Sequence, residues 1–231
     1  MKRKKEPAMA QFQIRDVEGM RQVQITIADE MVRARKGAMS NMRGNIHLIP
    51  RLPGTRDLIR SPFTREGAIR PYYEGTGEIV LQPSIGGYHL MEVAEGERWI
   101  LEPGVFWACE GSVQLGMTRD PFFASLWAGD GLFNWKTTLA GHGRAAIRTP
   151  GPVEIVDIND AQMRVQGRLV LGRTDGLRFS SQRPAAFLRS YISGQSRLRV
   201  FSGTGKLLVC WTPYWNEQLL RHVHNDFDDM T

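Results

Sequence analysis

Apolar and polar residues alternate along much of the chain. This period of two runs through Val23 to Ile27, Ile79 to Leu81 and Leu198 to Val200, and Lys206 to Trp211 is an apolar run of strand length. Successive side chains of a strand point to opposite faces, so the pattern predicts many short β-strands. Glycine and proline punctuate the sequence at short intervals, as in sandwiches, barrels and β-helices.

Long amphipathic helical patterns are nearly absent. Three segments have the length and the start signals of short helices, namely Pro121 to Ala128, Pro184 to Tyr191 and Asn216 to His224. We therefore expect an all-β fold with short connecting helices.

Recurring glycines predict an internal repeat. A Gly-x-Gly before a strand occurs at 75–77, 141–143 and 203–205, at intervals of about 64 residues. A second glycine recurs at Gly37, Gly104 and Gly167. The interpretation is three diverged copies of one β unit, at about 11–50 plus 194–215, 67–118 and 131–182.

The first of these copies is split between the two ends of the chain. We therefore expect strands near the N-terminus to pair with strands near the C-terminus, which would remove exposed sheet edges. We expect a single all-β domain at 11–215, preceded by a disordered basic tail at 1–10 and followed by a C-terminal tail or short helix at 216–231. The glycines interpreted as residues of tight turns or of close strand approach are Gly37, Gly75, Gly77, Gly104, Gly141, Gly143, Gly203 and Gly205.

Composition adds limits on the class of protein. Hydrophobic residues make up 42% of the chain and charged residues 23%, as in an ordinary globular protein. No run approaches eighteen apolar residues, and no apolar stretch follows the basic start, so we expect neither a membrane span nor a secretory signal. Cys109 and Cys210 lack metal-ligand spacing, which favours free thiols and a cytoplasmic setting.

Two passages resemble a known family. Residues 128–147 are similar to the Gly-Glu-Gly-Leu-Phe and Gly-x-Gly-x-Val segment of the mitochondrial-biogenesis (altered inheritance of mitochondria) family. Gly96-Glu97 and Glu102-Pro103-Gly104 resemble its Gly-Glu…Glu-Pro-Gly-Ala signature. Lys36 to Ser40 resembles the start of the same signature, with Lys36 in place of proline. The resemblance covers roughly residues 12 to 215.

This resemblance implies a fold like that of the tryptophan RNA-binding attenuation protein. Three double-stranded β-helix-like units would lie in one chain, and chains would associate into rings, expected to be homotrimers. RNA binding is not implied, because a fold does not carry a function by itself.

Motifs for catalysis are absent from the sequence. It has no Gly-x-Ser-x-Gly, P-loop or His-Glu-x-x-His motif, and its Gly-x-Gly pairs lack the third glycine and following helix of a dinucleotide site. His222 and His224, near Asp226, are the candidates for a metal site, and an acidic tail is the alternative. We expect no cofactor and no enzymatic activity.

Three functional hypotheses remain. The first is a non-enzymatic, homo-oligomeric β scaffold that acts through assembly or partner binding. The second is a nucleic-acid-binding ring, suggested by the basic pI of about 9.6 and by the fold resemblance. Arginines gathered in connecting segments, among them Arg70, Arg189 and Arg199, would form an anion-binding surface or a solvated surface. The third is a cupin-like protein that binds a small molecule or a metal. Six tryptophans would serve the core or a subunit interface.

Overall fold

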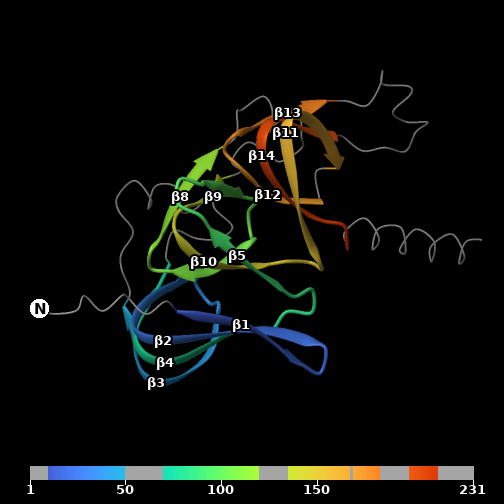
Figure 1. The fold of residues 1–231 in the computed structure, drawn as a ribbon. Helices are drawn as coiled ribbons and strands as arrows, with labels where there is room; N and C mark the ends of the chain where they lie inside the picture. Colours follow the sequence, from blue (N-terminus) through green and yellow to red (C-terminus); the bar gives the residue numbers. More distant parts are fainter. Residues whose placement is uncertain (1–9, 50–69, 120–134, 167–168, 183–197, 213–231) are drawn as a thin grey trace, which may run out of the picture.

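Every element in the described part of the computed structural model is a β-strand (Figure 1). The structure describes residues 10–49, 70–119, 135–166, 169–182 and 198–212. The strands are β1 (Gln11–Val17), β2 (Met20–Ala34), β3 (Met39–Ile49), β4 (Tyr72–Leu81), β5 (Tyr88–Val93), β6 (Trp99–Leu101), β7 (Phe106–Glu110), β8 (Val113–Arg119), β9 (Trp135–Gly141), β10 (Gly143–Arg148), β11 (Val153–Gln166), β12 (Val170–Thr174), β13 (Leu177–Gln182) and β14 (Leu198–Cys210). The all-β prediction is confirmed. The three predicted short helices lie outside the described residues.

The strands form two antiparallel sheets of seven strands each. The first has the order β3-β4-β2-β7-β10-β5, with β1 paired to β2. The second has the order β11-β14-β12-β6-β9-β8, with β13 paired to β14. The middle of the chain therefore contributes strands to both sheets.

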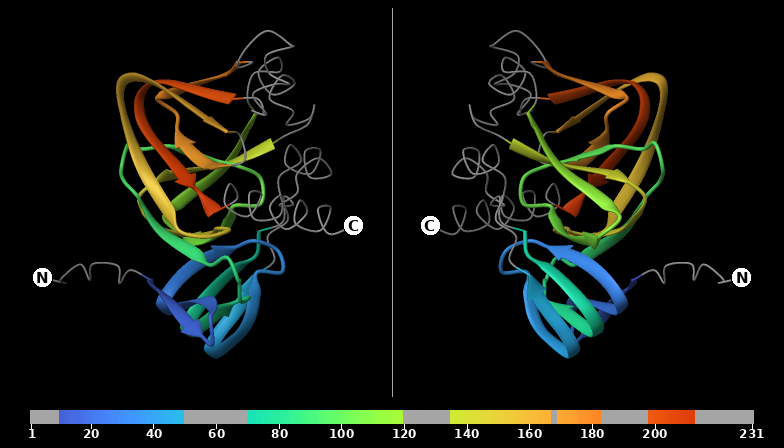
Figure 2. Two further views of the ribbon diagram at one scale, coloured as in Figure 1. Left: turned by 90° about the vertical axis from the view of Figure 1, so that its right-hand side faces the viewer. Right: turned by 90° about the vertical axis from the view of Figure 1, so that its left-hand side faces the viewer.

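The expected pairing of N-terminal with C-terminal strands is wrong. Strands β1, β2 and β3 belong to the first sheet, whereas β14 pairs with β11, β12 and β13 in the second. Figure 1 and the two side views of Figure 2 place the blue N-terminal strands and the red β14 at opposite ends of the molecule. Strand β1 pairs with its hairpin neighbour β2, whereas β2 also pairs with β4 and β7, and β14 pairs with strands of the last third of the chain.

Buried side chains form three hydrophobic clusters that follow chain order. The first centres on β1 to β4 and includes Ile25 and Leu81, the second on β5 to β10 and includes Phe106 and Leu139, and the third on β11 to β14 and includes Phe201. Alternation explains the first cluster directly, because Val23, Ile25 and Ile27 are almost inaccessible while Thr26 between them is exposed.

The eight glycines selected from the sequence have different roles in the structure. Gly37 and Gly104 lie in turns with positive φ, and Gly141 and Gly143 flank the bend between β9 and β10. The other four are not turn residues, because they lie inside strands: Gly75, Gly77, Gly203 and Gly205.

Close strand approach explains why glycine stands inside β4. A Cβ on Gly77, which has a φ of 154°, would lie 2.1 Å from the carbonyl oxygen of Arg43. A Cβ on the paired Gly44 would lie 2.6 Å from the carbonyl oxygen of Thr76. No side chain fits at either position without displacing the backbone of the neighbouring strand.

Candidate functional site

The described residues contain one buried group of charges that converges on an aromatic ring. Lys136 of β9, Arg173 of β12 and Arg199 of β14 place their cationic groups 5.5, 5.6 and 5.7 Å from the ring centroid of Phe179 in β13. Together with Glu102, which follows β6, we call these residues the Phe179 cluster. All five come from the second sheet or its turns, in segments far apart in sequence.

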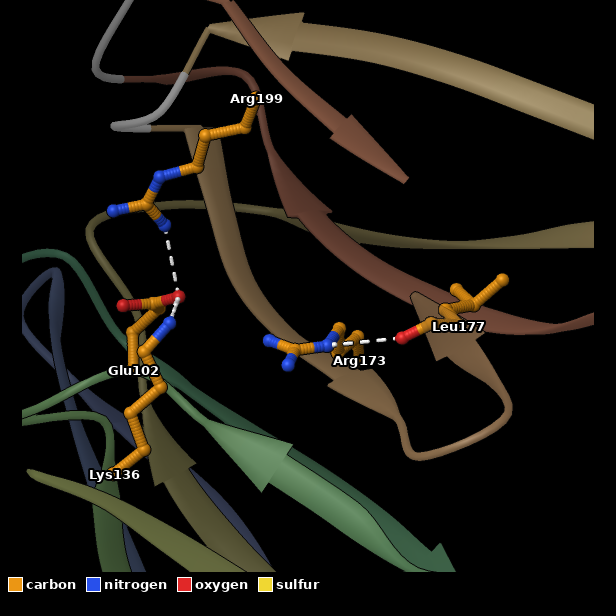
Figure 3. Close-up of polar contacts among 5 residues, drawn as sticks. All are labelled: Glu102, Lys136, Arg173, Leu177 and Arg199. Atoms are coloured by element: carbon orange, nitrogen blue, oxygen red, sulfur yellow. Dashed lines mark hydrogen bonds and ion pairs between the residues drawn. The ribbon is translucent and has the colours of Figure 1, made fainter. Parts of the chain in front are cut away.

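Glu102 joins two of these cations through one oxygen. Its Oε1 accepts hydrogen bonds from Lys136 Nζ at 2.6 Å and from Arg199 Nη1 at 2.8 Å (Figure 3). The side chains of Lys136 and Arg199 are only 1% and 8% exposed, and that of Glu102 is 14% exposed. Charge-assisted hydrogen bonds of this length are stronger than neutral ones, so Glu102 ties β9 to β14.

Arg173 is held separately from Glu102. Its Nε donates to the carbonyl oxygen of Leu177 at 3.3 Å, across the β12–β13 turn (Figure 3). Lys136, Arg173 and Arg199 also have interactions beyond these, so none of the three is free. The long aliphatic stems of these residues pack in the interior while their charged heads gather on Phe179, where each cation–π contact contributes about 1 kcal/mol.

A second polar contact links the turn before β6 to β14. Glu97 accepts hydrogen bonds from Lys206 Nζ at 2.7 Å and from Trp99 Nε1 at 3.0 Å. Burial by itself raises the pKa of Glu97, but the hydrogen bonds from Lys206 and Trp99 outweigh it and lower this pKa. The hydrogen bond to Glu97 in turn raises the pKa of Lys206. Both shifts favour the charged forms and stabilise the ion pair.

Two carboxyl groups of the first sheet, those of Glu30 and Glu110, have raised rather than lowered pKa values. Burial raises the pKa of Glu110, and burial followed by repulsion from Glu110 raises the pKa of Glu30. Glu110 Oε2 accepts the backbone N–H of Arg144 at 3.0 Å, while Glu110 Oε1 and both oxygens of Glu30 have no hydrogen-bond partner. This arrangement favours protonation of the pair rather than two negative charges.

Both cysteines are free, as the sequence predicted, and the structure shows that both are buried. Burial raises the pKa of the Cys109 thiol to about 12. A thiol that stays protonated is a poor nucleophile, so the structure gives Cys109 a packing role in the second hydrophobic cluster.

The residues predicted as a metal site lie outside the described part of the structure. His222 and His224 lie outside it, as do all but one of the arginines between 51 and 70. Within the described ranges, no group of three or more His, Cys, Asp or Glu side chains could hold a metal ion. His47 is exposed on β3, and burial lowers the pKa of His89 on β5.

Sequence reasoning missed most of the Phe179 cluster. Arg199 was selected only as one of several arginines in connecting segments, and Lys136 and Arg173 were not selected. A usable signal exists, because Lys136 stands next to Thr137, Thr138 and Leu139 in a strand buried on both faces. A lysine in such a strand requires a buried partner, although the sequence does not name it.

The described residues contain no helix long and apolar enough to cross a membrane. The class of protein is all-β, with two antiparallel sheets and buried charged residues in the second. Its described residues show no recognisable catalytic constellation. The chain belongs to the mitochondrial biogenesis AIM24 family, whose model matches residues 12–210.

Two relatives come from Streptococcus pyogenes. One is an uncharacterized protein of serotype M6, 24% identical over 137 residues, which are 59% of this chain and 54% of that protein. The match thus spans about half the length of this curated relative. The other is a crystal structure from a structural genomics consortium, with 21% identity, a TM-score of 0.67, and coverage of 92% of this chain and 99% of that one. This likeness shows the fold alone.

Proposed function

We propose that the protein is a non-enzymatic β scaffold that acts by associating with identical copies and with partner proteins. The observation that carries this proposal is the apolar surface of β3, the outermost strand of the first sheet. Met42 and Leu48 on this strand are 44% and 50% exposed. A long sheet edge with exposed apolar side chains is a site for pairing with another chain.

The buried charges support a structural role rather than catalysis. Glu102 contacts Lys136 and Arg199, and all three are engaged in joining strands of the second sheet. Hydrogen-bonded polar groups that join strands in this way rigidify the fold.

The finer architecture expected from the sequence belongs to the same proposal. Three related units, with a fold like that of the tryptophan RNA-binding attenuation protein, would each contribute one hydrophobic cluster. Support comes from a contact that recurs between glycines: Gly44 pairs with Gly77, and a Cβ on Gly203 would lie 2.8 Å from the carbonyl oxygen of Gly176. Three copies of the chain are the number expected from the family resemblance.

The arginines of the described residues favour the scaffold over a nucleic-acid-binding ring. Arg35 and Arg148 both lie over the ring of Trp107 at 5.3 Å, and Arg70 lies over Phe106 at 5.1 Å. Arg35 and Arg70 are partly buried against these rings, whereas Arg148 is exposed. A guanidinium that stacks on a ring of its own chain is less available for phosphate contacts. We expect no gel shift with unstructured RNA at physiological salt.

Light scattering across a dilution series tests the proposal. A scaffold of this kind has a mass that is a multiple of the 26.1 kDa chain at high concentration. Replacing two exposed apolar side chains on β3, in the double variant Met42→Lys/Leu48→Lys, should lower that mass. A matched control is Ile155→Lys, because Ile155 is also 44% exposed but lies on β11 of the other sheet.

A further inference from the structure

From the edge of β3 we infer a two-fold seam, in which β3 pairs antiparallel with β3 of a second copy, centred on Asn45. This inference rests on the proposed function and names the partner and the register of association. Figure 1 shows β3 at the outer margin of the first sheet, beyond β4.

The register of β3 with β4 is unbroken where the seam would form, and within it Gly44 adopts a φ of 104°. From Asn41, opposite Val80, to Ile49, opposite Tyr72, the ladder with β4 continues without a register shift. Among the described strands, β4 is the single neighbour of β3. The other edge of this segment therefore presents backbone N–H and C=O groups that a further strand can pair with.

Natural proteins often protect such edges with lysine or proline, and β3 contains neither. Its one charged residue is Arg43, and its side chains are exposed from Ser40 to Asn45. From Asn41 to Ile49 the edge therefore carries one charged side chain, and the register irregularity of β3 lies before this segment, at Met39 to Asn41.

The sequence of β3 is self-complementary about Asn45. In an antiparallel pair centred there, Met42 lies opposite Leu48 of the partner subunit, and the symmetry repeats this contact. Asn45 lies opposite Asn45 of the partner subunit. Met42, Ile46 and Leu48 share one face of the strand, so the apolar contacts extend the core around the buried Ile46.

Neighbouring registers lose this match. Centring the pair on Gly44 places Met42 opposite the buried Ile46 of the partner subunit and leaves the exposed Leu48 opposite Ser40 of the partner subunit. Centring it on Ile46 places Leu48 opposite Gly44 of the partner subunit. A register that repeats its contacts across a two-fold axis is the isologous geometry common to homodimers.

The seam has predictable strength and stoichiometry. Nine residues on each strand form about eight backbone hydrogen bonds across it. One strand pair buries less area than a standard protein interface, so association through it depends on concentration. Because the axis is two-fold, the seam joins copies in pairs, and in a trimeric protein it would link two rings.

Engineered cysteines test the register. The chain has two cysteines, and both are buried, so Asn45→Cys introduces one exposed thiol. Residues directly opposite each other in an antiparallel pair have Cα atoms about 5 Å apart, which a disulfide can span. We expect mild oxidation of Asn45→Cys to give a covalent dimer that a reducing agent reverses.

Asn41→Cys is the matched control, since Asn41 is an exposed asparagine on the same strand. In the proposed register its symmetry mate lies about 27 Å away, too far for a disulfide. Equal cross-linking of both variants, or none of either in the oligomer, would overturn the seam.

A second measurement separates this inference from the proposed function. Met42→Lys/Leu48→Lys should halve the mass of the assembly, whereas Ile155→Lys should leave it unchanged. An unchanged mass in the double variant refutes the seam but leaves self-association intact. A wild-type protein that is monomeric at every concentration refutes the proposed function itself.

Discussion

Replacing Glu102 by glutamine tests whether the Phe179 cluster holds the second sheet together. The substitution preserves shape but removes the charge that accepts hydrogen bonds from Lys136 at 2.6 Å and from Arg199 at 2.8 Å. Removing one partner of a buried ion pair lowers the free energy of unfolding by about 3–5 kcal/mol. Because Glu102 is 14% exposed, we expect the lower end of this range, about 3 kcal/mol, for Glu102→Gln.

Urea unfolding followed by circular dichroism measures this cost. With an m-value of about 3 kcal/mol per molar, the midpoint of Glu102→Gln should fall by about 1 M. The control is Glu154→Gln, because Glu154 accepts a hydrogen bond from Trp211 at 2.7 Å on the exposed surface. Its midpoint should stay within about 0.3 M, since exposed pairs contribute less than about 1 kcal/mol.

A double-mutant cycle with Lys136→Met identifies the contact responsible. If the ion pair carries the cost, the Glu102→Gln/Lys136→Met variant loses less stability than the two single variants added together. A loss below about 0.5 kcal/mol for Glu102→Gln, or strict additivity in the cycle, would refute a structural role for this pair.

Three further predictions concern other parts of the fold. Folding raises the pKa of Glu110 above 4.5, so the wild-type protein loses stability as the pH rises through that pKa. In thermal melts, Glu110→Gln should therefore be more stable than the wild-type protein at about pH 8 and should lose this advantage in acid. Gly77→Ala should lower the free energy of unfolding by more than about 3 kcal/mol, because the added Cβ meets a backbone oxygen. Gly96→Ala, whose Cβ would have no atom within 4 Å, should lower it by about 1 kcal/mol. Equal unfolding midpoints of the two variants would contradict the close approach of the strands at Gly77. Cys109 and Cys210 should react with a thiol reagent only after denaturant is added, and rapid labelling of the native protein would show that their burial is wrong.

Sequence patterns predicted the strands better than their partners. Alternation around Val23 to Ile27 and Ile79 to Leu81 correctly located β2 and β4, because burial of one strand face leaves a period of two. The same alternation does not say which strand pairs with which. The expected pairing of chain ends was wrong because β2 pairs with β4 and β7 in the first sheet, whereas β14 pairs with β11, β12 and β13 in the second.

The glycines and the charged cluster show why the rest was harder to predict. Gly77 and Gly203 resemble turn residues in sequence, yet they stand inside strands where another backbone approaches. Lys136 and Glu102 are 34 residues apart, and only the folded sheet brings them to 2.6 Å. A charge in an apolar strand signals a buried partner, but the identity of that partner depends on the topology.

The mass of the native protein across a dilution series tests self-association most directly. We predict a multiple of 26.1 kDa at high concentration, reduced by half in Met42→Lys/Leu48→Lys and unchanged in Ile155→Lys. A mass of 26.1 kDa at every concentration would contradict the proposed scaffold function.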